Sequence, residues 1–351
     1  MSDPIILAID TSCDETSVAV TCGRCILANE MYSQILVHKK WGGVVPNLAK
    51  RAHEERIDGV IETALKKSKK AFEDIDYIAV TYGPGLAIAL GVGINKAKDL
   101  SLKYQKKLIA VNHMEGHIYS CFAQNSKGNP NTPILFPYIA LLVSGGHTEL
   151  VLFKNHISYE IIGETLDDAA GEALDKAARM ILDAHVYPGG PVIEELAKKG
   201  NPNFIRFPRP LEKSKDLNFS YSGLKTSLYN YLKSESINRQ SGQKAYDKHH
   251  IAASFQEAVI DSLLIKLEKA VITYKIRNVL IAGGVVANMS LRKKARVLVK
   301  THNGKVIFPP YKSLYGDNAA MIGIAAYYKA KKGMFAQSFD DVERQARAQL
   351  I

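Results

Sequence analysis

Two copies of a strand, turn, strand pattern constrain the fold of this chain more than any other feature. In the first copy, the apolar run Ile5 to Ile9 leads into a polar turn, and Ser17 to Val20 forms the second strand. In the second copy, the strands Tyr138 to Val143 and Glu149 to Phe153 flank the turn 144–148, Ser-Gly-Gly-His-Thr. Because the copies lie about 130 residues apart, the repeat predicts two related lobes whose turns face a shared cleft.

The length of the chain agrees with two lobes. A chain of 351 residues is too long for one ordinary core and suits two domains. Strand patterns alternate with helix patterns, which is typical of an α/β fold. We expect a first lobe at residues 1–125, completed by a C-terminal helix at about 322–351, and a second lobe at residues 134–321. The stretch Asn125 to Pro133, rich in Asn, Gly and Pro, is the expected linker.

The two turns offer groups that bind anions. Hydroxyls and backbone amides in Thr11 to Thr16 can hold a phosphate, and the carboxylates there can hold a phosphate-bound cation. In the second turn, Gly145 and Gly146 let backbone amides approach an anion closely. Gly283 and Gly284 form a further close turn ahead of Asn288, and such glycines often admit a nucleotide base or ribose.

The stretch His113-Met114-Glu115-Gly116-His117 is a candidate metal clamp. Residues four apart share one face of a helix, so both imidazoles can reach a single ion. In the HExxH motif of metallopeptidases the Glu follows the first His directly, whereas Glu115 lies about 200° away around the helix from each His. The geometry therefore argues against a peptidase. Two ordinary polar residues on a surface helix are the alternative.

A third ligand decides between these two interpretations. Asp317 stands before the apolar helix Ala319 to Tyr328 and is the best placed candidate. An Asp at this position usually caps the helix, so the assignment stays open at the sequence level.

Helix signals occur at several other places in the chain. Asn47 is expected to cap a helix that runs to about Lys67, and a long amphipathic helix is expected at Ile251 to Tyr274. The irregular stretch Asn201 to Ser222 combines basic and aromatic residues. Its aromatic side chains suit stacking on nucleotides, although packing onto their own lobe is equally compatible with the sequence.

A carboxylate stripe is expected on one helix of the second lobe. Thr165 and Asp168 resemble a capping box for a helix to about Leu182. On this helix Asp168, Glu172 and Asp175 would project together, either as a solvated stripe or as a cleft wall. The proline- and glycine-rich turn that follows favours the cleft wall.

The net charge of +11 suggests an anionic partner, most often a nucleic acid. The basic residues gather in four clusters, which are Lys66 to Lys70, Arg206 to Lys215, Arg292 to Arg296 and Lys329 to Lys332. Each cluster alone is typical of a solvated surface, so only their sum is informative.

No apolar run approaches the roughly 18 residues of a membrane span. Four cysteines cannot form a disulfide framework, and the pair Cys22 and Cys25 flanks the turn of an expected hairpin. The first strand begins at Ile5, which leaves no room for a signal peptide. We therefore expect a soluble protein of the cytoplasm without membrane contact.

The motifs along nearly the whole chain resemble those of the tRNA N6-adenosine threonylcarbamoyltransferase family, once labelled O-sialoglycoprotein endopeptidase. The matching stretches are DTSCDETSVA, GPGL, HMEGH, LLVSGGHTELV, GETLDDAAGEALDKAAR, YPGGP, FSYSGLKT, AGGVVAN and GDNAAMI. The resemblance is closest to the bacterial branch. It implies the actin-like (ASKHA, sugar-kinase-like) ATPase fold, in which two RNase H-like lobes surround a cleft.

The resemblance also implies the reaction. Members transfer the threonylcarbamoyl group from threonylcarbamoyl-AMP to N6 of adenosine 37, next to the anticodon, in tRNAs that read codons beginning with A, and AMP leaves. A small paralogous actin-like subunit and an ATPase subunit are the implied partners, beside the tRNA. Two other classes share parts of the pattern: a non-catalytic actin-like scaffold that binds nucleotide and metal, and a sugar or carboxylate kinase. The kinase does not explain the two-His clamp.

Site residues follow from the same resemblance. It implies that His113, His117 and Asp317 hold one divalent metal, for which Fe²⁺ (iron) is favoured and Zn²⁺ or Mg²⁺ are alternatives. The residues implied to line the adenylate site are Leu142, Val143, Ser144, Gly145, Gly146, Asp175, Gly190, Glu194 and Asn288. No general base is evident in the sequence.

The sequence departs from the family pattern at four positions. Asp10 stands where bacterial members often have Glu, and Glu194 stands where Asp is common. Gly316 replaces the residue usual before the Asp ligand in bacterial members. Leu142 occupies the place of a metal-contacting Tyr in archaeal members, so the implied site has three protein ligands.

Overall fold

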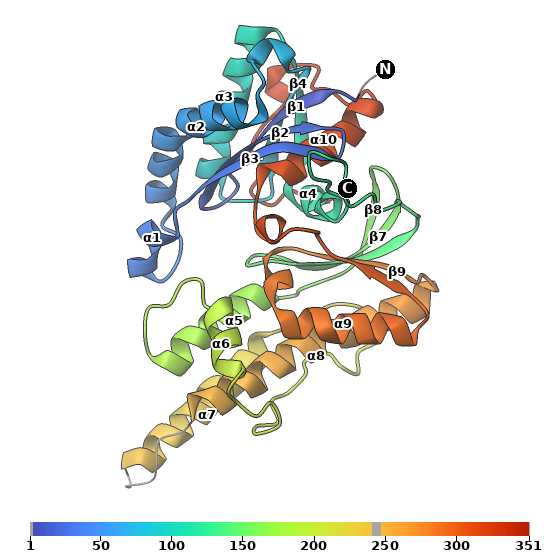
Figure 1. The fold of residues 1–351 in the computed structure, drawn as a ribbon. Helices are drawn as coiled ribbons and strands as arrows, with labels where there is room; N and C mark the ends of the chain where they lie inside the picture. The colour runs from blue at the N-terminus through green and yellow to red at the C-terminus, as the bar shows by residue number, and fades with distance from the viewer. Residues whose placement is uncertain (1–2, 241–246, 351) are drawn as a thin grey trace.

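The computed structural model describes residues 3–240 and 247–350, which form two five-stranded sheets (Figure 1). The strands are β1 (Ile5–Asp10), β2 (Glu15–Cys22), β3 (Cys25–Ser33), β4 (Tyr77–Gly83), β5 (Lys107–Asn112), β6 (Tyr138–Val143), β7 (Thr148–Asn155), β8 (Ser158–Glu164), β9 (Asn278–Ala282) and β10 (Lys305–Ile307). The first sheet has the order β3-β2-β1-β4-β5, and the second has the equivalent order β8-β7-β6-β9-β10. This match confirms the repeat that the sequence predicts.

Strand pairing is also the same in the two sheets. β1 pairs antiparallel with β2 and parallel with β4, and β6 pairs antiparallel with β7 and parallel with β9. The two predicted hairpin turns therefore lie at corresponding ends of β1 and β6. Parallel strands need crossover connections, which the helices between them supply.

The helices cover both sheets. They are α1 (Ile35–His38), α2 (Pro46–Ser68), α3 (Ala87–Tyr104), α4 (His113–Ser120), α5 (Ala170–Leu182), α6 (Gly190–Ala197), α7 (Ser222–Gln240), α8 (Lys248–Tyr274), α9 (Met289–Thr301) and α10 (Ala319–Lys331). α2 and α3 pack on the outer face of the first sheet, and α5, α7, α8 and α9 lie beyond the second sheet. α4 and α10 lie between the sheets and share one core with both of them.

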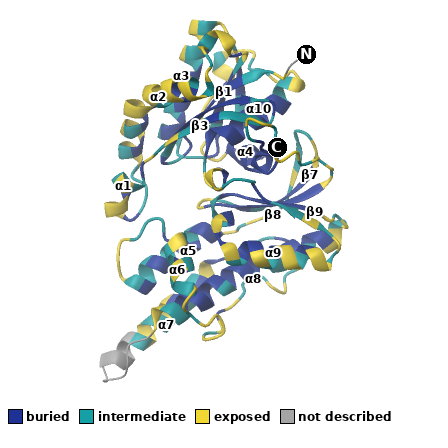
Figure 2. Cartoon of the chain, viewed as in Figure 1, coloured by how far each residue is buried: buried dark blue, intermediate teal, exposed yellow. Residues whose placement is uncertain are grey.

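Successive side chains of β1 point to opposite faces of the sheet, and both faces are covered, which explains why the strand is apolar throughout. Leu7 and Ile9 face the core of α2 and α3, whereas Ile6 and Ala8 face the core of α4 and α10. A strand that is covered on both faces reads as a continuous apolar run. Figure 2 shows the resulting buried layer through the middle of the molecule.

The helices α4 and α10 approach each other closely at Gly116. A Cβ atom at this position would lie 2.8 Å from Ile322 Cδ1 and 3.0 Å from Met321 Cγ. All eight residues of α4 are buried, so HMEGH belongs to a core helix and not to a surface helix. The alternative of two ordinary surface histidines is therefore wrong.

The starts of two helices differ from the predictions. The residue before α2 is Val45, and Pro46 occupies the first helical position, so Asn47 lies inside the helix and is not its cap. α5 begins at Ala170, because the Thr165 hydroxyl donates to the Asp168 carbonyl (2.7 Å) within a separate turn. α6 and α7 are not evident from the sequence pattern.

The C-terminal helix is shorter than expected. α10 ends at Lys331, and the chain then returns to the first sheet. The Gln345 amide donates to the Tyr82 carbonyl (2.8 Å), and the Asn112 side chain donates to the Gln349 carbonyl (3.0 Å). The limits of the two lobes given above stay a prediction.

Candidate active site

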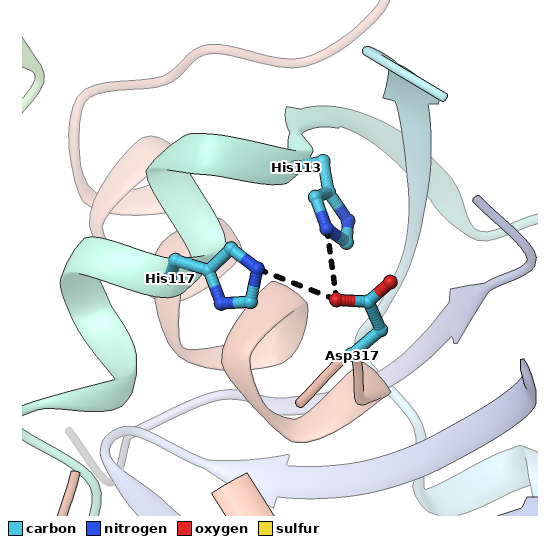
Figure 3. Close-up of side chains that lie close together, drawn as sticks. All are labelled: His113, His117 and Asp317. Atoms are coloured by element: carbon cyan, nitrogen blue, oxygen red, sulfur yellow. Dashed lines mark ion pairs between the residues drawn. The ribbon is translucent and has the colours of Figure 1, made fainter. Parts of the chain in front are cut away.

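Three side chains meet where α4 faces the start of α10 (Figure 3). Asp317 Oδ1 lies 3.2 Å from His113 Nε2 and 3.4 Å from His117 Nε2. The potential ligand atoms of the three residues all lie within 4.8 Å of one another. The structure thus brings together the two His of the clamp and the predicted third ligand.

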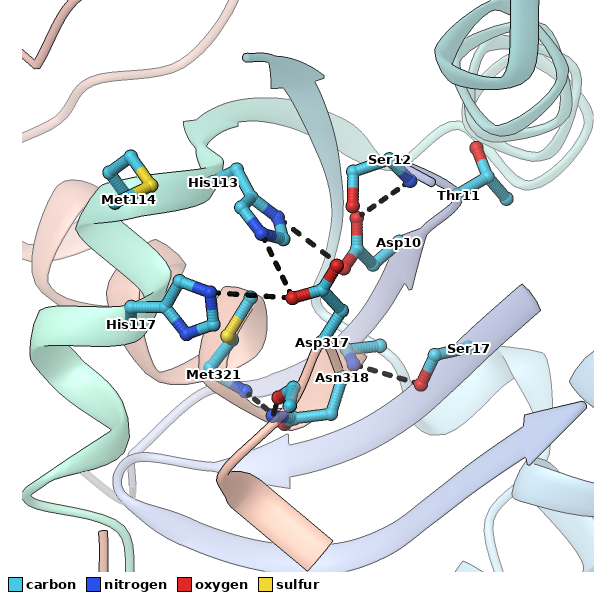
Figure 4. A network of polar contacts seen from close by, with 12 residues as sticks. Asp10, Thr11, Ser12, Ser17, His113, Met114, His117, Asp317, Asn318 and Met321 are labelled. Atoms are coloured by element: carbon cyan, nitrogen blue, oxygen red, sulfur yellow. Dashed lines mark hydrogen bonds and ion pairs between the residues drawn. The ribbon is translucent and has the colours of Figure 1, made fainter. Parts of the chain in front are cut away.

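Neighbouring residues cap the N-termini of α4 and α10, so His113, His117 and Asp317 are not used as helix caps. The Asn112 side chain caps α4 by accepting from the Met114 amide (2.8 Å). At α10 the cap is Asn318, whose side chain accepts from the Met321 amide (3.0 Å; Figure 4). The alternative that Asp317 is the helix cap is therefore wrong.

The charges at this cluster favour a bound cation. Burial disfavours the charged form of His113, but the carboxylates of Asp317 and Asp10 outweigh it and raise the pKa of His113 well above its usual value. Burial also disfavours ionisation of Asp317, yet the two imidazoles hold its pKa well below the usual value. Burial lowers the pKa of His117. The carboxylates of Asp10 and Asp317 therefore stabilise a positive charge at this place, whether it is a protonated imidazole or a bound cation.

The donor set fits a divalent metal ion. Metal bonds of about 2.0 to 2.2 Å place neighbouring ligand atoms roughly 3 to 3.5 Å apart, which agrees with the two distances to Asp317 Oδ1. His117 is fully buried, and its Nε2 makes no hydrogen bond among the described residues, only the 3.4 Å ion-pair contact with Asp317. A buried nitrogen without a hydrogen bond is costly, and a metal between these residues would satisfy it.

A second carboxylate stands behind His113. Asp10 at the end of β1 places Oδ2 3.6 Å from His113 Nδ1, the ring atom that faces away from Asp317 (Figure 4). Asp10 also accepts from the Ser12 amide (3.2 Å). Such a carboxylate fixes the orientation of a metal-binding imidazole. This role of Asp10 is not evident from the sequence, because Asp10 and His113 lie far apart in the chain.

Glu115 points away from this cluster, as the helical spacing predicts. It is buried, and its oxygens accept from Tyr159 Oη (2.9 Å) and Lys329 Nζ (3.2 Å). It therefore ties α4 to β8 and α10 and cannot act as the base of a peptidase.

A cleft of about 730 Å³ opens between the two lobes beside this cluster. Its volume lies in the range of small-molecule sites. Its lining includes Ser12, Asp14, Glu15, Gly85, His113, Ser144, Gly145, Gly146, His147, Gly171, Glu172, Asp175, Gly190, Glu194, Asn288 and Asp317. Both predicted turns therefore face the same space.

The second turn presents free amides to the cleft. The amides of Ser144 and His147 bond within the turn, whereas those of Gly145 and Gly146 have no partner among the described residues. The start of α5 lies against this turn, since a Cβ at Gly171 would be 2.4 Å from the Ser144 carbonyl oxygen. Free amides near a helix N-terminus form an anion site.

Three other predicted site residues line the cleft and have structural partners. Asp175 Oδ1 accepts from the amides of Gly189 (2.7 Å) and Gly190 (3.0 Å), and burial raises its pKa. Glu194 accepts from the Met289 amide (2.8 Å). These bonds fix the start of α6 and join it to α9.

Asn288 uses both of its polar atoms locally. It caps α9 through the Leu291 amide (3.0 Å) and donates to Gln256 (2.7 Å). Leu142 and Val143 are fully buried in β6 and are not part of the cleft lining.

The expected carboxylate stripe does not form. Asp168 precedes α5 and pairs with Lys176 and Lys225, and Glu172 shares Lys176 with it. Asp175 instead faces the turn before α6. Charge pairing and the later helix start therefore separate the three carboxylates, although Glu172 and Asp175 do line the cleft, as the cleft-wall interpretation predicts.

The basic and aromatic stretch 201–222 packs onto its own lobe. Phe207, Phe219 and Tyr221 are buried in the core of the second lobe, so they cannot stack on nucleotides. On α9, Lys294 is paired with Glu257 and Asp261 (3.1 Å), which leaves less free charge there than the sequence suggests.

Two residues of the cleft, His147 and Tyr187, have contacts that the sequence does not predict. The His147 ring lines the cleft, where burial and then the charges of His113 and His117 lower its pKa to about 4. Tyr187 Oη donates to Asp14 Oδ2 across the cleft (3.1 Å). The glycine-rich motifs around both residues were evident, but their contacts between distant segments were not.

Sequence comparison decides the family. The profile of tRNA N6-adenosine threonylcarbamoyltransferase matches residues 25–324. The protein of that name from Thermosipho africanus is 47% identical over 335 residues, which cover 95% of this chain and 97% of that protein. The one from Bacillus subtilis is 47% identical over 333 residues, which cover 95% and 92%. The chain belongs to the tRNA N6-adenosine threonylcarbamoyltransferase family. This confirms the family and the enzyme class that the motifs predict.

Solved structures confirm the fold. Full-length HypF in its phosphate- and nucleotide-bound form gives a TM-score of 0.61 at 14% identity, over 96% of this chain and 56% of that one. Component A of the Acidaminococcus fermentans (R)-2-hydroxyglutaryl-CoA dehydratase gives 0.54 at 15% identity, over 94% and 100%. The fold is the actin-like ATPase fold. None of the helices in residues 3–240 and 247–350 combines the length and apolar character that a membrane span requires.

Proposed function

We propose that this chain transfers the threonylcarbamoyl group from threonylcarbamoyl-AMP to N6 of adenosine 37 in tRNAs that read codons beginning with A, and that AMP is released. The observation that carries the proposal is that His113 and Asp317, which form a cluster with His117, line the same cleft as the Gly145-Gly146 turn. An acyl adenylate presents a carbonyl and a phosphate side by side, and these two neighbouring sites match that pair of groups.

We assign the adenylate to the second-lobe wall of the cleft. The free amides of Gly145 and Gly146 would donate to the phosphate, and Asp175, Gly190, Glu194 and Asn288 would border the nucleoside. The residues Leu142, Val143 and Ser144 would position this turn from within or next to β6. These roles follow the family resemblance.

We assign metal binding to His113, His117 and Asp317, with Asp10 orienting His113. A divalent metal bound there would supply Lewis-acid polarisation of the carbonyl or phosphate oxygen. The turn amides would stabilise negative charge that develops on the leaving AMP. The two lobes would hold the adenine amine against the carbamoyl carbon, so that proximity supplies much of the rate. No side chain is assigned as general base.

We propose Fe²⁺ as the metal. Two imidazoles and one carboxylate with open positions form the donor set of mononuclear non-haem iron sites, and the same set suits Zn²⁺. Mg²⁺ is less well matched, because it prefers oxygen ligands. The proposed partners are a small paralogous actin-like subunit and an ATPase subunit, by family resemblance.

The test is transfer from synthetic threonylcarbamoyl-AMP to an unmodified tRNA transcript, with the modified nucleoside measured by mass spectrometry. The full chain is assayed alone and with its partner subunits. Wild-type protein should form product, and Asp317→Asn should abolish it because a charged ligand is lost. Asp340→Asn makes the same chemical change at an exposed carboxylate in the C-terminal tail and should leave the rate unchanged.

The scaffold alternative gives a different result. A wild-type chain that binds tRNA and nucleotide, but yields no modified nucleoside with or without partner subunits, would contradict the proposed function.

A further inference from the structure

An exposed aromatic and basic segment lies between β3 and α2. It comprises α1 and the short turn after it, and the side chains of Leu36 and Trp41 are 85% and 56% exposed. Lys39 and Lys40 are also exposed, and Lys40 Nζ lies 5.3 Å from the Trp41 ring centre. Large exposed apolar groups among cations are typical of a binding surface.

The same segment borders the cleft. Ile35 and Val44, at its two ends, are part of the cleft lining together with His113 and Asp317. The segment thus turns one side towards the candidate site and the other towards solvent. Figure 2 shows α1 at the exposed edge of its lobe, across from α5 and α6.

The exposed surface continues onto the second lobe. Arg179 of α5 donates to the Gly42 carbonyl (2.5 Å), which joins the segment to a hollow on α5 and α7. This hollow is lined by Lys176, Arg179, Met180, Lys225, Thr226 and Tyr229. Tyr229 is 56% exposed. We call Leu36, Lys39, Lys40, Trp41, Arg179 and Tyr229 the Trp41 rim.

Charge on the Trp41 rim is available to an anionic partner. Within residues 3–240 and 247–350, Lys39, Lys40 and Arg179 have no carboxylate at ion-pair distance. In contrast, Lys176 and Lys225 in the adjoining hollow are paired with Asp168. Three cations beside two exposed aromatic rings match the groups that bind unpaired nucleotides.

We propose that the Trp41 rim docks the anticodon loop of the tRNA, with loop bases stacked on Trp41 and Tyr229 and loop phosphates held by Lys39, Lys40 and Arg179. The proposal rests on the proposed function, since it names the surface that delivers the adenosine. An adenine amine reaches the cluster in the cleft only after the base leaves its stack. The bases on either side then lose a neighbour, and aromatic side chains at the cleft mouth replace it.

A direct test uses the fact that Trp41 is the sole tryptophan of the chain. A synthetic anticodon stem-loop RNA is titrated into the full chain while tryptophan emission is recorded. The proposal expects saturable quenching, and a fully paired RNA duplex of equal charge should quench several-fold less. Equal quenching by both RNAs, or none with the stem-loop at concentrations that saturate binding, would overturn it.

Variants test the two kinds of contact separately, with affinity measured from a labelled stem-loop RNA. Trp41→Ala should weaken binding about tenfold or more, and Trp41→Phe should recover most of the loss because a ring remains. Lys39→Ala with Lys40→Ala should reduce the slope of log affinity against log salt by about 1 to 2.

A matched control removes the same charge elsewhere. Lys293→Ala with Lys300→Ala takes two exposed lysines from α9 and should leave the affinity within about twofold. If the Lys293 and Lys300 double variant weakens RNA binding as much as the Lys39 and Lys40 double variant, the affinity depends on net charge alone and the rim proposal is wrong. If the rim variants bind and transfer like the wild type, the proposal fails while the proposed function stands. Absence of transfer by wild-type protein that still shows rim binding would contradict only the function.

Discussion

Asp317 lies at the centre of the candidate site because its neighbour caps α10. Asn318 accepts from the Met321 amide, so the Asp317 carboxylate remains directed at His113 and His117. Asp10 supports the same imidazole from the opposite side. The site therefore contains one carboxylate that can bind a metal and one that orients a ligand, and the two should differ in how strongly they affect metal affinity.

We expect a graded loss of metal across three variants. Asp317→Asn should remove stoichiometric metal, whereas Asp10→Asn should weaken affinity by about 10- to 100-fold. Glu115→Gln should keep the metal, because Glu115 contacts Tyr159 and Lys329 instead, but should lower the free energy of unfolding by about 1 to 3 kcal/mol. Elemental analysis and urea unfolding measure both effects. Loss of metal in Glu115→Gln with full retention in Asp317→Asn would show that the ligand assignment is wrong.

The sequence predicts the three residues of the cluster but not their surroundings. The i to i+4 spacing is a local property of a helix, so it places His113 and His117 on one face without tertiary information. Asp317 is compatible with a ligand or a cap in the sequence, and its position beside α4, with Asn318 as the cap, excludes the cap. Asp10, His147 and the bond between Tyr187 and Asp14 depend on contacts between distant segments, which no local pattern encodes.

The partly buried carboxylate of Glu149, whose Oε2 is shielded from solvent, predicts a pH dependence of stability. Glu149 faces Glu164 across β7 and β8, and burial, with a contribution from Glu164, raises its pKa from 4.5 to about 7. Below about pH 4.5 the group is protonated in both states, so its contribution to stability is complete. That contribution is lost as the pH rises through 7, because the folded state then holds a buried charge. The loss is on the order of 1 to 3 kcal/mol.

Glu149→Gln should therefore stabilise the protein at pH 8 and change little at pH 4, as urea unfolding at the two pH values would show. Glu164→Gln, at the exposed partner position, should give a smaller effect of the same sign. An equal change at both pH values for Glu149→Gln would contradict the assignment.

At the scale of elements, the close packing of α4 on α10 determines the distance between the clamp and Asp317. Gly116 lies between the two His and is the point where α10 comes nearest. Because α4 is buried on all sides, neither helix can move without disturbing both sheets. Close helix packing thus explains the glycine in HMEGH. Gly116 would affect metal affinity only indirectly, through the distance between α4 and α10.

Gly116→Ala should lower the free energy of unfolding by about 1 to 3 kcal/mol and weaken metal binding, since Ile322 and Met321 must shift. Gly59→Ala is the matched control. Gly59 is exposed within α2 with nothing near its Cβ position, so alanine there should stabilise by about 0.5 to 1 kcal/mol. Urea unfolding and metal titration of both variants test this. If Gly116→Ala lowers the stability but leaves the metal affinity unchanged, the packing of α4 on α10 does not determine where the metal-binding side chains lie, and the prediction is wrong.

At the scale of the whole molecule, two lobes share a middle layer. Repeated strand patterns predicted both sheets and their relation, because a period of two and a polar turn are local signals. The layer of α4 and α10 was not predicted, since burial by two sheets at once leaves no amphipathic stripe to read. Likewise α7 is not evident from the sequence. Phe207, Phe219 and Tyr221 lie in the core of the second lobe, where Phe207 packs against Phe255 of α8, whereas Phe204 is exposed.

The shared layer predicts that the two lobes unfold together. Side chains of β1 and β4 from one sheet and of β6 and β9 from the other meet in the core of α4 and α10. Loss of either sheet would expose this apolar surface, so neither lobe should persist alone. Hydrogen exchange under increasing denaturant should therefore give one opening free energy and one slope for the slowest amides of β1 and β6. Two distinct free energies, with the amides of one sheet exchanging while the other stays protected, would show that α4 and α10 belong to one lobe only.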